Sequence, residues 1–492
     1  MTVEGTDERV DEAATDETTA TEPAHRRSGG RVRQFLRLCF PTTASIVIAA
    51  LVCVAAPVTM VAIHIHENPM FSPIDEAAHF DYVNRIAQGD VPRLGQPMLS
   101  TTLRTVACRG SALPGAVQPP CTVPVIHPDQ FGGGGLSYEA QQPPAYYAIT
   151  APLRWLAVHV GGLSPLSGTR AIGALWLAVG LLLLWAAGRV MRLDPKVIGA
   201  VVLLVAISPA VIYESSIVTN TASMIFMGSL VALTGALAYR YPGRWVPPTL
   251  FAVGVLAAAA KETGALAAVV VAVMFAIYTY VQRPATESRA TAAWAWFRRW
   301  LPNGGALAIG AVLTVIAWSV ISRQLSLITP KTLPSLGVLR GYPVGVALIA
   351  REATTLLTPA TGSFDPFRSN DSATVPATSA LAQHLQTITG LLLGYLFIAG
   401  GAAGLFVRRR QWNHWLGLLS LPALFVGGIV LGVGIWLTYN ADPGLSGRYG
   451  LPLLPFLALA LVASARGKWV LGGLWTVAVG LCGLDFFYLL AR

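Results

Sequence analysis

The stretch TTASIVIAALVCVAAPVTMVAIHI, residues 42–65, decides the fold class of this chain. It contains no Asp, Glu, Lys or Arg, and a helix needs only about 20 apolar residues to cross the hydrocarbon core of a bilayer. The run is longer than the apolar part of a secretory signal peptide and lies far from residue 1, so we interpret it as a retained first membrane span. Runs of similar length recur from here to the end of the sequence.

The composition of the whole chain agrees with this interpretation. Of the 492 residues, 54% are hydrophobic and 12% are charged, and the mean hydropathy is +0.58. A soluble protein carries about twice that charged fraction, so an ordinary cytosolic enzyme is excluded. We predict an all-α polytopic membrane protein whose transmembrane domain covers residues 39–492. The eleven expected spans are residues 42–65, 169–190, 197–213, 218–239, 247–260, 264–281, 304–322, 387–407, 415–438, 449–464 and 469–490.

The charged residues indicate which side of the membrane each connection occupies. Residues 1–38 form a tail that is acidic at first and then rich in arginine. We expect this tail to be disordered and cytoplasmic, with its arginines beside anionic lipid headgroups rather than nucleic acid. With the N-terminus inside, the short basic connections at residues 189–196, 240–244, 408–410 and 466–468 also fall inside, as the positive-inside rule requires.

Two outer segments, residues 66–168 and 323–386, are too long to be simple connections. Within the first, residues 144–160 are apolar but contain Arg154 and His159, and a crossing here would invert the sides of every later loop. We therefore predict an amphipathic helix that lies in the outer interface. Further on, Lys261-Glu262-Thr263 separates two short spans and predicts a tight hairpin at the outer face.

A short helix is expected directly after the first span. Ser72 is a typical N-cap residue, Pro73 suits the first helical position, and Gly89 is a typical residue for ending a helix. This helix would begin where the membrane ends.

Along that helix, Asp75, His79 and Tyr82 follow i, i+4, i+7 spacing and share one face, with Glu76 beside them. The result is a compact polar surface at the outer membrane boundary. The pattern has a structural alternative, because Ser72 and Asp75 have the form of a capping box and acids stabilise a helix N-terminus in any case.

Four motifs together resemble a known family. They are S-P-I-D-E-A-A-H-F at residues 72–80, Y-E-A-Q-Q-P-P-A-Y-Y at 138–147, K-E-T at 261–263 and R-Y-G-L-P-L-L-P at 448–455. The chain resembles the GT-C membrane glycosyltransferases from Pro41 onward. Within these it is most similar to a branch of predicted bacterial membrane proteins whose first outer loop reads P-x-D-E-x-A-H-F.

The resemblance implies a GT-C-like bundle in a bacterial plasma membrane with its active site outside the cytoplasm. It also implies transfer of a hexose or pentose from a polyprenyl-phosphate donor to a glycan, glycolipid or protein acceptor of the cell envelope. Asp75 occupies the position of the family's catalytic base, and Glu76 is its neighbour. Arg448, and after it Lys261, are the cations expected to contact the donor phosphate.

The remaining site residues are expected to bind substrate. They are His79, Tyr82, Glu139, Gln142 and Tyr146. Each has an ordinary alternative, since an acid in a loop is commonly exposed and aromatic residues are common at membrane interfaces.

The two cations also have structural alternatives. Arg448 could extend to the interface from a helix end, and Lys261 could pair with Glu262 or Glu214 to close the hairpin.

Two further expectations concern ions and cysteines. Some members of the family use a divalent cation, Mg or Mn, but the sequence assigns no metal ligand here. Cys108 and Cys121 both lie in the first outer segment, where an oxidising compartment allows a disulfide that closes a short loop.

Two other functions fit the same composition: a transporter of lipid-linked sugars or polysaccharide, and a noncatalytic membrane protein of the same fold. A transporter predicts polar residues near the middle of the membrane. Here Glu214, Lys261, Glu262 and Arg448 are all expected near one face, with Asp485 as the exception. This distribution favours an enzyme with a site on one side.

Overall fold

The computed structural model describes residues 27–73, 75–112, 117–281, 289–332, 345–360, 377–406, 412–439 and 445–490. The described residues therefore leave out most of the predicted N-terminal tail. They also leave out residues 333–344 and 361–376 of the second long outer segment, which we predicted at residues 323–386. In the described part of the chain the regular structure is helical, apart from two isolated β-bridges, Phe71 with Ser111 and Pro97 with Leu136. The helices are α1 (Arg27–Cys39), α2 (Thr43–Ala50), α3 (Ala56–Glu67), α4 (Glu76–Ala87), α5 (Ser100–Arg109), α6 (Ala145–His159), α7 (Pro165–Val190), α8 (Pro195–Ala206), α9 (Pro209–Ser216), α10 (Met224–Arg240), α11 (Val246–Ala260), α12 (Ala265–Val281), α13 (Arg289–Trp300), α14 (Ala306–Leu325), α15 (Val346–Thr355), α16 (Ala377–Ala402), α17 (Trp412–Tyr439), α18 (Leu454–Ser464) and α19 (Lys468–Leu490).

The prediction of an all-α polytopic membrane protein is confirmed. Nine helices among the described residues are long and apolar enough to cross a membrane, and the bent pair α8 and α9 raises the number to as many as ten. The remaining predicted span corresponds to α11, which has 15 residues. Each of the eleven predicted spans thus coincides with helical structure. That all eleven cross the membrane stays a prediction.

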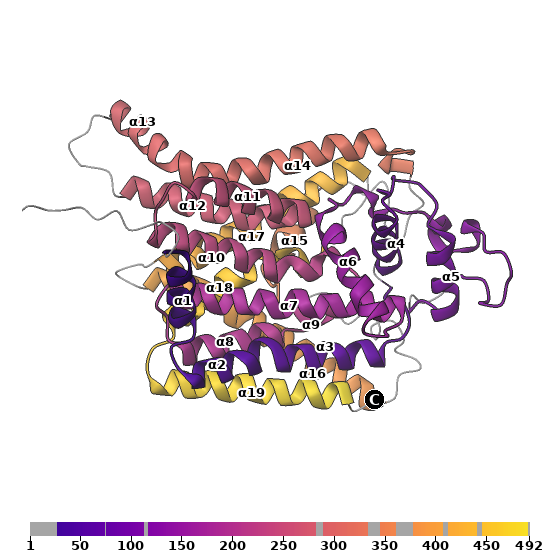
Figure 1. The fold of residues 1–492 in the computed structure, drawn as a ribbon, viewed down its shortest axis with the longest axis horizontal. Helices are drawn as coiled ribbons and strands as arrows, with labels where there is room; N and C mark the ends of the chain where they lie inside the picture. The colour runs from indigo at the N-terminus through magenta and orange to yellow at the C-terminus, as the bar shows by residue number, and fades with distance from the viewer. Residues whose placement is uncertain are drawn as a thin grey trace, which may run out of the picture.

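The long helices run side by side, and the other elements gather at the two ends of this bundle (Figure 1). Beyond one end lie α4 and α5, and α6 runs obliquely there instead of following the bundle. We call this the loop end; it carries residues 68–112 and 117–164 of the described chain. The opposite end, which we call the basic end, carries Arg192, Arg240 and Lys468 at or next to the ends of α7, α10 and α19.

Two local features place polar residues at the loop end. Between α8 and α9 the chain bends by 61° at Ser208 and Pro209, because proline has no backbone N–H to continue the helical pattern. The bend directs α9 and Glu214 away from the path of α8. After α9, the short 3-10 helix η6 (Asn220–Ser223) begins the next membrane helix with four polar or small residues.

Glycines allow these elements to approach closely. A Cβ at Gly173 of α7 would overlap the backbone carbonyl of Ser215 in α9. A Cβ at Gly228 of α10 would overlap the carbonyl of Pro452, which lies in the 3-10 helix η11 (Gly447–Leu453) at the start of the tenth predicted span. Small residues at such contacts let membrane helices pack backbone against backbone.

The predicted start of the first outer helix is wrong by three residues. Helix α4 begins at Glu76, not at Pro73, because Asp75 has a left-handed backbone with φ of 57°. Ser72 does not cap the helix: its N–H donates to Glu76 Oε2 at 2.7 Å, and its hydroxyl hydrogen-bonds to that of Tyr213. The predicted end is confirmed, since Gly89 follows the helix with φ of 79° and donates its N–H to Ile86.

Candidate functional site

Five ionisable residues from five separate segments meet at the loop end. They are Asp75 before α4, Glu139 in the 3-10 helix η5 (Glu139–Gln141), Glu214 in α9, Lys261 after α11 and Arg448 in η11. We call them the charged cluster. The ring of Tyr449 joins its two cations, since Lys261 Nζ lies 5.1 Å and Arg448 Cζ 5.3 Å from the ring centroid.

Arg448 is held between two carboxylates at long distances. Its Nη1 is 3.4 Å from Glu214 Oε1, and its Nη2 is 3.5 Å from Asp75 Oδ2. The side chain is only 11% exposed, so the alternative in which it extends to the interface is wrong. Its Nε has no hydrogen-bond partner among the described residues, nor has Oε2 of Glu214. A buried guanidinium with long contacts and an unused donor is suited to binding an additional anion.

Asp75 is the accessible carboxylate of the charged cluster. Its side chain is 30% exposed, compared with 10% for Glu139 and 3% for Glu214. Tyr138 lies close enough to interact with it. Its left-handed backbone is costly for a residue other than glycine, and such outliers gather at functional sites. Because of this turn the Asp75 side chain is partly exposed, whereas that of the next residue, Glu76, is fully buried.

Glu139 is buried beside Asp75. Its Oε2 lies 3.8 Å from Nε2 of His79 and has no hydrogen-bond partner among the described residues. Burial, followed by the charge of Asp75, raises the pKa of Glu139 to about 8, against the opposing effect of Lys261 and Arg448. At neutral pH this carboxyl group therefore keeps its proton and is able to donate a hydrogen bond.

Lys261 is positioned by neutral partners. Its Nζ donates to Asn220 Oδ1 at 3.0 Å and to Thr221 Oγ1 at 2.5 Å. Asn220 in turn donates to Oε1 of Gln142 at 2.9 Å, and the Gln142 side chain also hydrogen-bonds to Glu139. The geometry does not match the alternative in which Lys261 closes the hairpin through an ion pair, and a polar chain instead connects its amine to η5.

Glu76, the second predicted catalytic carboxylate, has a structural environment. It is fully buried, and Arg170 binds both of its oxygens at 2.6 Å. The N–H groups of Ser72 and Val218 donate to the same carboxylate. With both oxygens occupied, Glu76 is suited to holding the turn at Asp75 and has no free position for an acceptor hydroxyl. Of the two acids expected as the base, only Asp75 has an accessible carboxylate.

The predicted aromatic residues form a stack behind the charged cluster. Tyr82 lies on Tyr147 with ring centroids 3.7 Å apart and donates its hydroxyl to the carbonyl of Gln142. His79 Nδ1 is 2.7 Å from the Tyr147 hydroxyl, and burial holds the pKa of His79 well below its usual value. Tyr146 is fully buried against Tyr147 and Trp176. These side chains support the site from behind, and the fully buried Tyr82 and Tyr146 present no face on which a sugar could stack.

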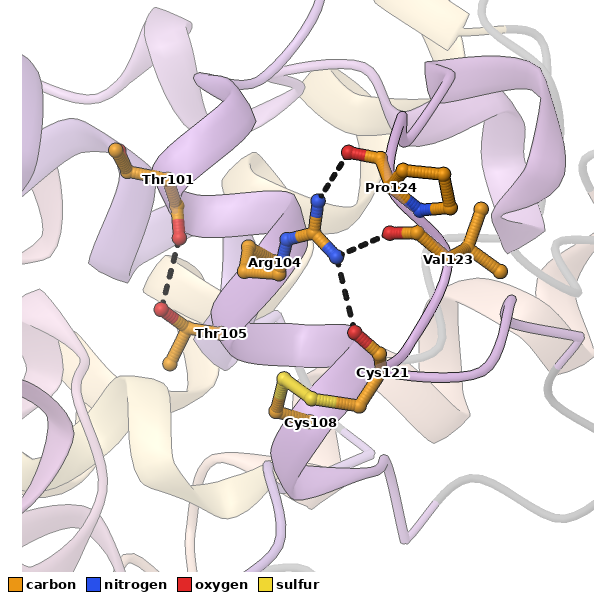
Figure 2. Close-up of a disulfide and its surroundings, with 7 residues drawn as sticks. All are labelled: Thr101, Arg104, Thr105, Cys108, Cys121, Val123 and Pro124. Atoms are coloured by element: carbon orange, nitrogen blue, oxygen red, sulfur yellow. Dashed lines mark hydrogen bonds between the residues drawn. A yellow bond between two sulfur atoms is a disulfide. The ribbon is translucent and has the colours of Figure 1, made fainter.

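The first outer segment is fastened by the pair of cysteines expected there. Cys108 at the end of α5 and Cys121 form a disulfide, with Cα atoms 4.5 Å apart. Figure 2 shows Arg104 beside this bond, donating to the carbonyls of Cys121, Val123 and Pro124. The disulfide and Arg104 together hold residues 121–124 against α5.

The described residues do not offer a ready metal site. Among them, no group of three or more His, Cys, Asp or Glu side chains is arranged to hold a metal ion. Whether this chain uses the divalent cation of some family members stays open, and we assign no ligands to one.

Several residues of the site were not selected from the sequence. Arg170, the partner of Glu76, had a usable signal, because a lone arginine near the start of an apolar span is costly unless it is paired. Glu214 is expected from the sequence as a partner for Lys261 and as a polar residue near one face, not as a partner of Arg448. Asn220 and Thr221 had no signal in the sequence, because their role depends on contacts with a segment about forty residues away.

Comparisons with protein-family models, curated proteins and solved structures found no match to this chain. The likeness to GT-C enzymes therefore rests on four motifs, at residues 72–80, 138–147, 261–263 and 448–455. Each of these motifs contributes one member of the charged cluster: Asp75, Glu139, Lys261 and Arg448.

Proposed function

We propose that this protein is a GT-C-type glycosyltransferase that moves a sugar from a polyprenyl-phosphate donor to a cell-envelope acceptor. The site would face the outside of a bacterial plasma membrane. The observation that carries the proposal is the pairing of a partly exposed carboxylate, Asp75, with a buried guanidinium 3.5 Å away, Arg448. Glycosyl transfer from a lipid phosphate needs one group of each kind.

In the proposed reaction, Asp75 accepts the proton of an acceptor hydroxyl as the hydroxyl oxygen attacks the anomeric carbon of the donor. A new glycosidic C–O bond forms, and the bond between the anomeric carbon and the phosphate oxygen breaks. The polyprenyl phosphate leaves with the electron pair of that bond. Arg448 stabilises the developing negative charge through its guanidinium group, while Lys261 supplies a second positive charge.

The position of the cluster suits a lipid-linked donor. The charged residues lie at the end of the helix bundle, where a lipid phosphate would sit with its polyprenyl chain along the apolar helices. A protonated Glu139 can donate to a sugar oxygen, and Gln142 adds amide groups at the same place. These residues favour a hydroxyl-rich substrate.

Binding and transfer can be tested separately with the full chain in lipid nanodiscs. Polyprenyl phosphate, the proposed leaving group, serves as the binding probe, and a panel of radiolabelled polyprenyl-phosphate sugars serves for transfer to envelope extracts. We expect Asp75→Asn to bind the probe at least as tightly as the wild type but to lose 10²–10⁴-fold in transfer rate. Arg448→Gln should weaken binding of the probe by about tenfold or more.

The matched control is Arg323→Gln, which removes an exposed arginine from the end of α14. It should leave both readouts unchanged. Full transfer activity in Asp75→Asn would overturn the assignment of the base. If the wild type neither binds polyprenyl phosphate nor transfers from any donor in the panel, the proposed function is wrong.

A further inference from the structure

The basic end contains a cavity of about 1120 Å³, at the opposite end of the bundle from the charged cluster. It lies among the C-terminal ends of α7, α10 and α12 and the first turn of α17. Its volume exceeds that of a typical small-molecule pocket. The proposed transfer reaction gives this cavity no role.

The polar lining of the cavity donates hydrogen bonds. Arg192 and Arg240 contribute guanidinium groups, and Arg240 is fixed at the wall by its bond to the carbonyl of Val190 at 2.5 Å. No Asp or Glu is among the described residues that line the cavity.

This arrangement favours an anion with several oxygen atoms. The two arginines select negative charge. The first turn of α17 adds the positive end of a 28-residue helix.

The rim of the cavity is apolar and open to the surroundings. Leu405 is 60%, Phe406 87% and Val281 71% exposed. Side chains of this kind at the end of membrane helices contact lipid tails. A ligand that fits both parts carries a phosphate group on an apolar tail.

We propose that this cavity binds the phosphate headgroup of an anionic phospholipid from the membrane leaflet at the basic end. The headgroup accepts hydrogen bonds from Arg192 and Arg240, and the acyl chains lie against the rim. The lipid stabilises the packing of α7, α10, α12 and α17. This proposal is independent of the transfer reaction at the loop end.

The proposal is tested by measuring lipid binding to the purified full chain by native mass spectrometry. The probes are dioleoyl phosphatidylglycerol and dioleoyl phosphatidylcholine, which have the same tails. We expect selective retention of phosphatidylglycerol. Arg240→Gln should weaken this binding about fivefold. The control Arg244→Gln removes an exposed arginine of the same connection that does not line the cavity, and should leave binding unchanged.

Arg192 provides a variant that separates binding from folding. Its backbone is left-handed, with φ of 60°, a conformation that glycine adopts without strain. Arg192→Gly should therefore keep or raise the melting temperature of the lipid-free protein while weakening phosphatidylglycerol binding about fivefold.

Three results would overturn the proposal. Equal retention of the two lipids would show that the headgroup charge is not recognised. Equal weakening by Arg244→Gln and Arg240→Gln would show a general surface effect. If inorganic phosphate raised the melting temperature as much as phosphatidylglycerol at the same concentration, the cavity would be a site for a free anion instead of a lipid.

Discussion

Asp75 and Glu76 are adjacent in the sequence but have opposite environments. The left-handed turn at Asp75 leaves its carboxylate 30% exposed, whereas Glu76 enters the helix and is fully buried. Arg170 then binds Glu76 and also donates to the carbonyls of Asn68 and Met70. One arginine thus ties the end of the first span, the turn and α4 together.

Glu76→Gln should destabilise the protein by about 3–5 kcal/mol, because it leaves the guanidinium of Arg170 buried without its counter-charge. Unfolding of the purified protein in detergent measures the difference from the wild type. Asp75→Asn is the matched comparison and should lose less than about 1 kcal/mol, since its carboxylate is partly exposed and makes only a long contact with Arg448. Equal stability of the two variants would contradict the structural role of Glu76.

Glu139 predicts a pH dependence of stability. Burial and Asp75 raise its pKa to about 8 in the folded protein, from 4.5 in the unfolded chain, although Lys261 and Arg448 oppose the shift. Between these values the folded state holds a proton that the unfolded state has lost. The contribution of Glu139 to stability therefore falls as the pH rises from about 4.5 to about 8.

The neutral variant Glu139→Gln removes this titration. Its melting temperature relative to the wild type should increase from pH 5.5 to pH 8. The same difference at both pH values would mean that Glu139 is ionised in the folded protein.

The charged residues of the site are easier to predict from the sequence than the neutral ones. Asp75, Glu139, Lys261 and Arg448 stand out because each lies in one of the four motifs that carry the GT-C resemblance. Asn220 is inconspicuous in the sequence, yet it joins Lys261 to Gln142. Contacts of that kind depend on how the helices pack, and a single sequence does not specify them.

At the scale of elements, the contact between α10 and η11 sets the position of Arg448. The backbone of Gly228 lies against the carbonyl of Pro452, four residues after Arg448, with no space for a Cβ atom. A side chain at residue 228 would push η11 away from α10. The location of the guanidinium therefore depends on a glycine that itself contacts no ligand.

Gly228→Ala should lower stability by about 1–3 kcal/mol through overpacking, despite the better helix propensity of alanine. Gly480→Ala in α19 is the control, because a Cβ at that glycine meets nothing within 4 Å. It should be neutral or should stabilise the protein by up to about 1 kcal/mol. Thermal unfolding of the two variants should therefore give changes of opposite sign or clearly different size. Similar changes would mean that α10 and η11 are not in close contact.

Hydrophobicity located the apolar helices, but it did not reveal their irregularities. The prediction of one span at residues 197–213 missed the 61° bend at Pro209, since apolar composition is continuous across the break. The start of α4 was misplaced because Ser72 and Pro73 have the right residue types for a helix start. The buried bonds of Ser72 to Glu76 and Tyr213 instead hold this segment in another conformation.

At the scale of the whole molecule, the two ends of the bundle differ in chemistry. The loop end combines acids with cations in one cluster, whereas the cavity at the basic end is lined by arginines without an acid among its described residues. Positively charged connections stay in the cytoplasm. The basic end should therefore face the cytoplasm and the charged cluster should face outward, where a sugar donor has to be carried on a lipid.

Cysteine labelling of intact cells tests this orientation. Val125 at the loop end is 60% exposed and Trp245 at the basic end is 71% exposed, so a cysteine at either position is accessible to a reagent on its own side. A membrane-impermeant maleimide should label Val125→Cys in intact cells, and Trp245→Cys only after the membrane is permeabilised. The wild-type chain is the control, because its free cysteines are buried or half-buried. If instead Trp245→Cys is labelled in intact cells and Val125→Cys only after permeabilisation, the charged cluster faces the cytoplasm. Nucleotide sugars are present there, so a polyprenyl-phosphate donor would no longer be needed.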